Sequence, residues 1–234
     1  MKKVLLLFGT LLPLAVFAQD ESEEKEKKQH SENEARDRIV FGYSFDNWIY
    51  DRNEIDSLKT KWNSWGFHFY YMYDLPIGKS RFSFAPGLGF RASWVKNNSY
   101  LDDSVDSLGT IFRPLDTIGY KRNSLVASYF DIPLELRYRS KPNSKNKSFK
   151  LAIGCVAGVQ MSNHTSTKTD INGDTKIVRV HRWEDLTRFQ FGPTFRIGYG
   201  SVNLFAYYSV TNFFKKDKGP DLHPFSAGFS INAL

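Results

Sequence analysis

Apolar residues alternate with small or polar residues along the chain after Ile39, and this period of two constrains the fold more than any other feature. Between positions 81 and 94, for example, Phe82, Leu88 and Trp94 share one parity, and small or charged residues occupy the other. Successive side chains of a β-strand point to opposite faces, so such a segment has one apolar and one small or polar face. The pattern predicts eight strands, at residues 39–46, 64–73, 81–94, 129–139, 148–162, 187–199, 202–211 and 223–233.

The connections between these segments alternate between short and long. Short connections rich in Gly, Pro, Ser and Asn are expected at residues 74–80, 140–147 and 200–201. Long polar connections are expected at residues 47–63, 95–123, 163–186 and 212–222. Short turns at one end and long loops at the other are typical of outer-membrane barrels. The sequence therefore predicts an all-β fold, an eight-stranded antiparallel up-and-down transmembrane β-barrel with short periplasmic turns and long extracellular loops.

A soluble lipocalin-like binding barrel is the alternative with the same alternation, and in it the apolar faces would point inward. The expected strands of roughly 10 to 14 residues are closer to membrane-spanning length than to that of ordinary globular strands. The second face is rich in Gly, Ala and Ser, which suits the narrow interior of a small barrel. Aromatic residues near strand ends predict interfacial girdles. These residues are Trp48, Trp65, Tyr73, Trp94, Tyr129, Tyr138 and Tyr199.

The N-terminal 38 residues differ from the rest of the chain. Residues 1–18 combine two lysines, an apolar stretch and a final Ala18, which is the pattern of a secretory signal peptide cleaved after Ala18. Residues 19–38 are charged and nearly devoid of apolar side chains, so we expect a disordered periplasmic tail. Residues 39–234 would then form the barrel, in the cell outer membrane. Cys155 is the single cysteine, which excludes a disulfide scaffold.

Three segments carry a resemblance to a known family. The sequences YFDIPLELRY at residues 129–138, FAPGLGF at 84–90 and GCVAG at 154–158 resemble strands of the PorT-like outer-membrane β-barrel family. The resemblance extends over about residues 39–234, and its most specific element is Pro133 within a strand. It implies the barrel fold and a kinship with the PorT component of a type IX secretion apparatus. It also implies envelope or secretion proteins as partners, through the outer loops or the N-terminal tail, besides the lipid of the outer membrane.

Several charged or polar residues fall on the predicted inward faces of the strands. They are His68, Arg91, Asp131, Glu135, Arg137, Lys150, Gln190 and Arg196. The interior of an eight-stranded barrel is just wide enough for side chains to fill it, and an isolated buried charge costs several kcal/mol. We therefore expect a polar network in the lumen in which Arg91, Arg137 and Arg196 pair with Asp131 and Glu135. Such a network closes the barrel to ions.

Catalysis would need a nucleophile, a base and an acid close together in place of a network of ion pairs. Small outer-membrane barrels include lipid A-modifying enzymes, and the candidate groups here are His164 with Ser162 or Ser166, and His181 with Glu184 or Asp185. No diagnostic spacing links them, so the sequence predicts a non-enzymatic structural or accessory protein without cofactor or metal.

The segment 170–174 lacks the spacing and the distal Glu of a calcium-binding EF-hand. Basic residues are scattered, and nucleic-acid binding is not expected.

Asn172-Gly173 is typical of a type I′ turn, and we expect it to close a hairpin that projects above the membrane. In an unbroken hairpin around this turn, the residue numbers of two directly paired residues would sum to 345. Each odd-numbered residue would then pair with an even-numbered one. Both flanking barrel strands, however, have odd residues on their outward faces. Because directly paired residues share a face, the ladder must contain a bulge or an interruption between residues 162 and 188.

Short motifs in the two earlier outer loops predict modification sites. Asp-Ser or Asp-Thr followed by an apolar residue resembles the acceptor for periplasmic O-glycosylation in bacteria that carry this barrel family. The candidate acceptors are Ser57, Ser104, Ser107 and Thr117. Long loops on a rigid scaffold also commonly carry binding surfaces.

Overall fold

The computed structural model describes residues 38–233, except 52–54, 56–57, 103–109, 116–119, 142–147, 172–173 and 182–183. The signal peptide and nearly all of the charged tail expected from the sequence lie outside these residues. No helix in the described part of the chain is long and apolar enough to cross a membrane. The main strands are β1 (Ile39–Ile49), β2 (Trp65–Met72), β4 (Phe82–Asn97), β7 (Tyr120–Arg139), β8 (Phe149–Ile171), β10 (Phe189–Tyr199), β11 (Val202–Tyr208) and β12 (His223–Ala233).

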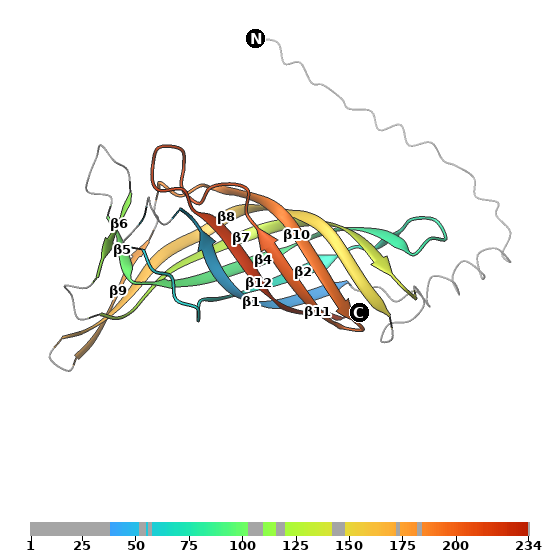
Figure 1. Cartoon of the computed structure of the whole chain (residues 1–234), viewed down its shortest axis with the longest axis horizontal. Helices are drawn as coiled ribbons and strands as arrows, with labels where there is room; N and C mark the ends of the chain where they lie inside the picture. Colours follow the sequence, from blue (N-terminus) through green and yellow to red (C-terminus); the bar gives the residue numbers. More distant parts are fainter. Residues whose placement is uncertain are drawn as a thin grey trace, which may run out of the picture. The chain divides into compact units, whose positions relative to one another are not determined.

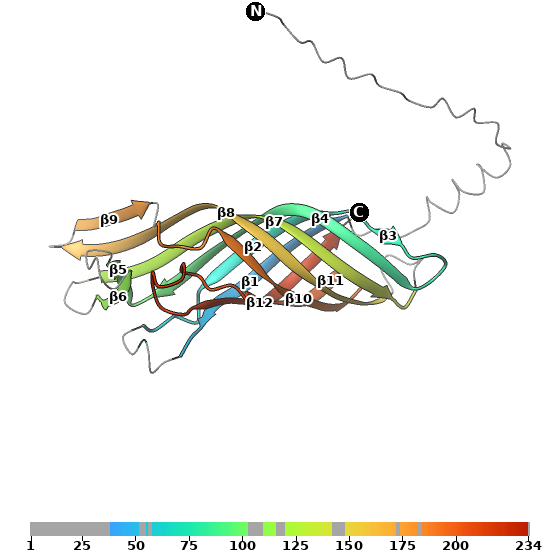
Figure 2. The same cartoon turned by 90° about the horizontal axis from the view of Figure 1, so that it is seen from above.

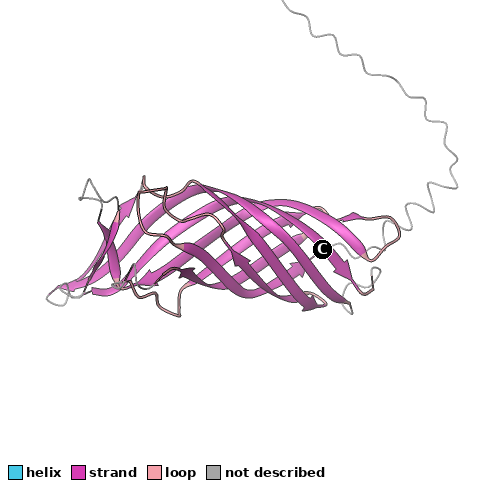
Figure 3. Ribbon diagram, turned by 45° about the horizontal axis from the view of Figure 1, so that its top comes forward, coloured by secondary structure: helices cyan, strands magenta, loops and turns pink. Residues whose placement is uncertain are grey.

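These eight strands form a closed antiparallel ring. Each strand pairs with the next one along the chain, and β12 pairs with β1 from Ile39↔Ala233 to Ile49↔His223. Figure 3 shows the strands inclined to the long axis of the ring, as closure of a sheet requires. All eight strands predicted from the sequence are confirmed. Strands β7 and β8 extend beyond the predicted segments because the alternation ends before the hydrogen-bonded ladder does. In β7 the apolar residues Leu125, Val126 and Ala127 are consecutive, and in β8 residues 163–170 are polar on both faces.

The two ends of the ring differ. At one end the connections are short, and Gly78 and Gly200 adopt the positive φ values of 60° and 62° that tight turns need. At the other end lie additional strands (Figures 1 and 2). The additional strands of the molecule are β3 (Leu75–Pro76), β5 (Ser99–Asp102), β6 (Ile111–Pro114) and β9 (Asp174–His181). Strand β3 pairs with β4 at the short-turn end, whereas the β5–β6 hairpin and β9 lie at the long-loop end.

The apolar faces of the ring strands point outward, as predicted for a membrane barrel and opposite to the facing of a lipocalin. Phe41, Leu88 and Ile231 are 50%, 53% and 54% exposed, whereas the intervening polar side chains are buried. Two residues of the predicted girdles do not belong to them. Trp48 and Tyr129 are buried inside the ring, because both occupy the inward parity of their strands.

The interior of the ring becomes apolar at the long-loop end. There, residues from several connections pack together over the ends of the strands, and we call this cluster the apolar cap. Its members are Trp48, Ile55, Leu58, Val95, Leu101, Phe112, Leu125, Ala127, Tyr129, Leu186, Phe213, Phe214 and Leu222. The ring of Trp48 lies 6.0 Å from that of Phe112 and 5.6 Å from that of Phe213, measured between centroids. The long loops are therefore folded over the ring.

The expected break in the β8 ladder is present. Strand β9 pairs with β8 from His164↔His181 to Ile171↔Asp174, so the paired positions sum to 345 as expected. The predicted turn residues 172 and 173 lie outside the described residues. On the other edge of β8, the pairing with β7 shifts between Ser128↔Ser162 and Tyr129↔Gln160, so Met161 is an extra residue. Beyond this bulge, Thr165 and Thr169 take the inward face. The pairing of β8 with β10 ends at Val159↔Phe189, so the ladder is also interrupted.

Candidate functional site

The ion pair between Arg91 and Asp131 lies at the centre of the ring interior. Strand β4 supplies Arg91 and the neighbouring strand β7 supplies Asp131, which is fully buried. The Asp131 carboxylate accepts hydrogen bonds from Arg91 Nε at 2.8 Å and Arg91 Nη2 at 3.3 Å. It also accepts one from the Tyr70 hydroxyl at 2.7 Å. Both oxygens of a buried carboxylate are thereby satisfied, which is the condition under which such a charge is tolerated.

Aromatic rings enclose the Arg91 guanidinium on two sides. Its carbon atom lies 4.7 Å from the ring centroid of Tyr129 and 4.6 Å from that of Tyr207, as expected for cation–π contacts. Arg91 Nη1 donates to the side-chain oxygen of Gln190 at 3.2 Å, and the amide nitrogen of Gln190 donates to the Tyr129 hydroxyl at 2.9 Å. The guanidinium is thus held by charge, hydrogen bonds and ring contacts at the same time.

A second cluster of charges lies nearer the short-turn end of the ring. Glu135 accepts hydrogen bonds from Arg137 Nε at 2.9 Å and from Arg196 Nη2 at 2.7 Å. Asp74 lies 2.6 Å from Arg139 and 3.7 Å from Arg137, and its carboxylate accepts a hydrogen bond from Ser83 at 2.7 Å. Glu135 and Arg137 face inward together because they are two residues apart on one strand.

Glycines on the inward faces make room for these side chains. A Cβ atom on Gly158 would lie 2.3 Å from the Asp131 carboxylate, and one on Gly42 would lie 2.2 Å from the ring of His68. His68 contacts rings: its centroid lies 4.7 Å from that of Tyr70 and 4.6 Å from that of Phe205. The small residues of the alternating pattern thus lie opposite large polar ones.

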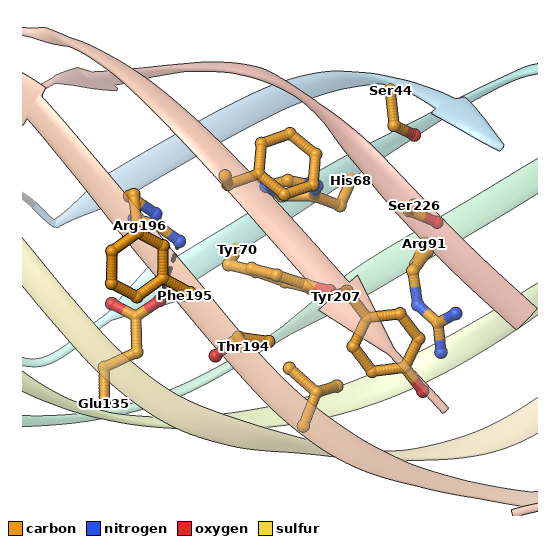
Figure 4. Close-up of a pocket in the computed structure, with 12 residues that line it drawn as sticks. Ser44, His68, Tyr70, Arg91, Glu135, Thr194, Phe195, Arg196, Tyr207 and Ser226 are labelled. Carbon is orange, nitrogen blue, oxygen red and sulfur yellow. Dashed lines mark hydrogen bonds and ion pairs between the residues drawn. The ribbon is translucent and has the colours of Figure 1, made fainter. Parts of the chain in front are cut away.

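Little free space remains in the interior. Figure 4 shows an interior pocket in which Glu135 and Arg196 lie on one side and Arg91 lies on the other. The cavity between them measures about 20 Å³, and two others measure about 20 and 10 Å³. A space of this size holds about one water molecule. The interior cavities next to these charges are therefore too small to admit a substrate.

The structure brings most of the predicted site residues together. Arg91 pairs with Asp131, and Arg137 and Arg196 pair with Glu135, so the five charges form two clusters. Lys150 and Gln190 also face inward. His68 lies between the clusters but contacts aromatic rings. The candidate O-glycosylation residues Ser57, Ser104, Ser107 and Thr117 all lie outside the described residues.

Several members of the network did not emerge from the sequence. Asp74 falls in a predicted turn, and only the pairing of the following residues with β4 brings its side chain inside. Tyr70 and Tyr207 occupy positions of inward parity, so the alternation of the sequence is sufficient to place their side chains inside the ring. Arg139 also has inward parity, but its acidic partner comes from another strand connection.

The histidines considered for catalysis face each other. The rings of His164 on β8 and His181 on β9 have centroids 5.0 Å apart. Among the described residues, the hydrogen bonds of these rings include none to a serine hydroxyl or a carboxylate, and Asp185 accepts a hydrogen bond from Thr110 at 2.7 Å. Ser162, His181 and Glu184 line one surface hollow of about 840 Å³, but no hydrogen bond among the described residues joins them in the manner of a nucleophile, a base and an acid.

The histidine pair makes the β8–β9 hairpin sensitive to pH. His164 lies beyond the part of β8 that pairs with β10. Partial burial, and then the nearby positive charge of His181 and Arg179, lowers the pKa of His164 below its ordinary value of 6.5. The opened hairpin therefore binds a proton at a higher pH than the closed one, and closure weakens as the pH falls through this window.

We expect amide protection factors in β9 to fall between about pH 8 and about pH 5, measured by hydrogen exchange after correction for intrinsic rates. His164→Gln reduces this pH dependence, whereas the amides of β12, which lack such a pair, keep their protection. Because His164 is only partly buried, solvent screening keeps the change modest. Equal protection of β9 across this range contradicts the prediction.

Comparison with known proteins places this architecture in a family. The family model described as outer membrane protein beta-barrel domain matches residues 17–215, which is most of the chain. A comparison with curated proteins found no significant match. The match covers seven of the eight ring strands, β1 to β11, and agrees with the closed antiparallel ring. The chain therefore belongs to the outer membrane protein beta-barrel domain family.

Proposed function

We propose that the chain spans the outer membrane as an eight-stranded up-and-down barrel with a closed lumen, acting without catalysis as a structural or accessory component of an envelope assembly. The observation that carries this proposal is the facing of the strands. Aromatic and aliphatic side chains cover the outside of the ring, whereas Arg91, Asp131, Glu135 and other charged residues are buried inside. In water this arrangement would leave a large apolar surface exposed, but in a bilayer it is the stable one.

The length of the apolar belt supports this proposal. On β4, the outward residues run from Phe82, whose ring is tilted by 55° against that of Tyr138, to Trp94, which stacks on Trp65 with ring centroids 4.3 Å apart. Twelve residue steps correspond to about 40 Å along a strand and, at a tilt of about 40°, to a height of about 30 Å. The apolar band of known outer-membrane barrels is of similar height, about 25 Å.

The orientation follows from the lengths of the connections. We place the short turns in the periplasm and the apolar cap, with hairpins β5–β6 and β8–β9, outside the cell. The resemblance of residues 129–138 to the PorT-like family supports a role beside a type IX secretion apparatus. The cap and its loops offer the surface for such partners, since the interior offers none.

Cell fractionation and affinity purification test this function. We expect the protein from its native host to remain with outer membranes after an alkaline carbonate wash. Purification in mild detergent should recover envelope or secretion proteins with it. Release by carbonate contradicts membrane integration, whereas firm integration with recovery of the barrel alone contradicts only the accessory role.

The charged clusters and the apolar cap predict an electrically silent barrel. Reconstituted in planar bilayers, the protein is expected to give no stable single-channel currents, because the cavities between its buried ion pairs hold about one water each. A porin reconstituted by the same procedure serves as the positive control. Reproducible current steps that scale with protein concentration would show that the lumen is open.

A further inference from the structure

Basic side chains gather on the outward face of the sheet, directly beyond the aromatic residues at the long-loop end. The register aligns Trp65, Trp94, Val126 and His164 in one row across β2, β4, β7 and β8. Two residues further along, the next row consists of Lys96, Ser124, Ser166 and Arg179. The following row pairs Arg122 with Lys168. The outward face thus changes from aromatic to basic within about 7 Å, the length of two residues in a strand.

A surface depression lies where the rows meet. It measures about 220 Å³, and its lining includes Trp65, Trp94, Lys96, Arg122, Ser124 and Arg179. Arg122 and Arg179 are exposed, and Lys96 Nζ donates to the backbone oxygen of Asn63 at 2.9 Å. We call Lys96, Arg122, Lys168 and Arg179 the basic shelf.

The basic shelf has no acidic partner in the part of the chain that the structure describes. Within the described residues, none of the ion pairs of the structure involves a member of the shelf, and the lining of the depression contains no carboxylate. Asp170, one row further along β8, is paired with Lys121. Four cations on neighbouring strands without acids repel one another, so an anion bound between them would relieve that repulsion.

The geometry points to the phosphorylated headgroup of an outer-leaflet lipid as the occupant of this depression. This inference rests on the membrane orientation proposed above. Aromatic girdles lie at the level of the lipid headgroups, so cations next to Trp65 and Trp94 meet the phosphate. Arg122 and Arg179 offer the forked donors that suit phosphate oxygens, and Ser124 and Ser166 lie in the same row as Arg179.

The apolar surface adjoining the depression favours a lipid over a soluble anion. Phe67 stacks near Trp94 with centroids 5.8 Å apart, and Phe90 and Phe130 form a pair further down the same face. A lipid bound by its phosphate would lay its acyl chains along these rings. A free phosphate ion would contact only the cations and would make no contact with these aromatic rings.

Native mass spectrometry of the folded protein in detergent micelles tests this inference, with lipid A and chemically dephosphorylated lipid A as probes. We expect retention of lipid A and weak retention of the dephosphorylated form. Arg122→Gln/Arg179→Gln is expected to weaken retention about 30-fold, which corresponds to about 1 kcal/mol for each cation near a membrane surface. Lys96→Gln alone should weaken it about fivefold by the same reasoning.

The control removes the same charge at the other end of the ring. Lys79→Gln/Arg81→Gln lies by the β3–β4 turn and should leave lipid A retention unchanged. Equal losses in both double variants would show general electrostatic attraction and overturn the inference. Displacement of lipid A by millimolar inorganic phosphate would overturn the assignment to a lipid. Insertion into phosphatidylcholine vesicles is measured on the same samples: failure to insert contradicts the proposed function, whereas insertion without lipid A retention contradicts only this inference.

Discussion

Replacing Asp131 by Asn is expected to lower the free energy of unfolding by about 3 to 5 kcal/mol, the usual effect of removing one partner from a buried ion pair. Asparagine preserves the shape of the side chain, so the change isolates the charge. Arg91 would remain buried between Tyr129 and Tyr207 without its counter-ion. Urea titration of the barrel folded in lipid vesicles, followed by its heat-modifiable migration in gels, measures this difference.

Two further variants make the result interpretable. Asp170→Asn removes a carboxylate from a partly exposed pair, in which the Lys121 side chain is 56% exposed and that of Asp170 is 29% exposed, and should cost about 1 kcal/mol or less. Arg91→Gln/Asp131→Asn removes both charges, so part of the loss should be recovered, and the double-mutant cycle gives the coupling between the two side chains. Similar costs for Asp131→Asn and Asp170→Asn would mean that the interior is wet and screens its charges.

Replacing Leu88 by Arg is expected to destabilise the folded barrel in a bilayer by about 2 to 4 kcal/mol, the range observed for cations at the midplane of outer-membrane barrels. Leu88 is 53% exposed and lies midway along β4 between Phe82 and Trp94. The added guanidinium would therefore enter the centre of the apolar belt. The same vesicle-based urea titration applies, and a lower yield of inserted protein should accompany the loss.

Val178→Arg is the matched control, since Val178 on β9 is 44% exposed and lies outside the ring. We expect a change of about 0.5 kcal/mol or less there, as for most surface substitutions. The two positions have similar exposed fractions, so comparing Leu88→Arg with Val178→Arg distinguishes a side chain that faces lipid from one that faces water. If the outside of the ring faced water, the two arginines would be tolerated equally.

The strand-forming segments and the facing of Arg91, Asp131, Glu135 and Arg196 could be predicted because parity is a local property of the sequence. The partner of each charge could not, because pairing depends on the register between strands. Glu135 on β7, for instance, reaches Arg196 on β10 across the ring interior. The prediction of Trp48 and Tyr129 as girdle residues was wrong because it followed their position near strand ends, whereas their parity places both side chains inside.

The additional strands and the apolar cap were harder to foresee. The register expected around the Asn172-Gly173 turn predicts a bulge or a break in the ladder. The structure contains both, a bulge at Met161 in the pairing of β8 with β7 and a gap in pairing before β10. The cap joins residues as distant in sequence as Trp48 and Phe213, and no periodic pattern signals contacts between irregular loops. Asp74 was missed for the same reason, since a turn residue has no parity to follow.

The apolar cap also bears on the order of assembly. Its members come from the strands β1, β4 and β7 and from connections that are far apart in the chain, and they meet where the ring brings the ends of its strands together. We therefore expect the outer loops to acquire their final form only after β12 has joined β1. A protein that recognises this surface would then distinguish finished molecules from those still being inserted.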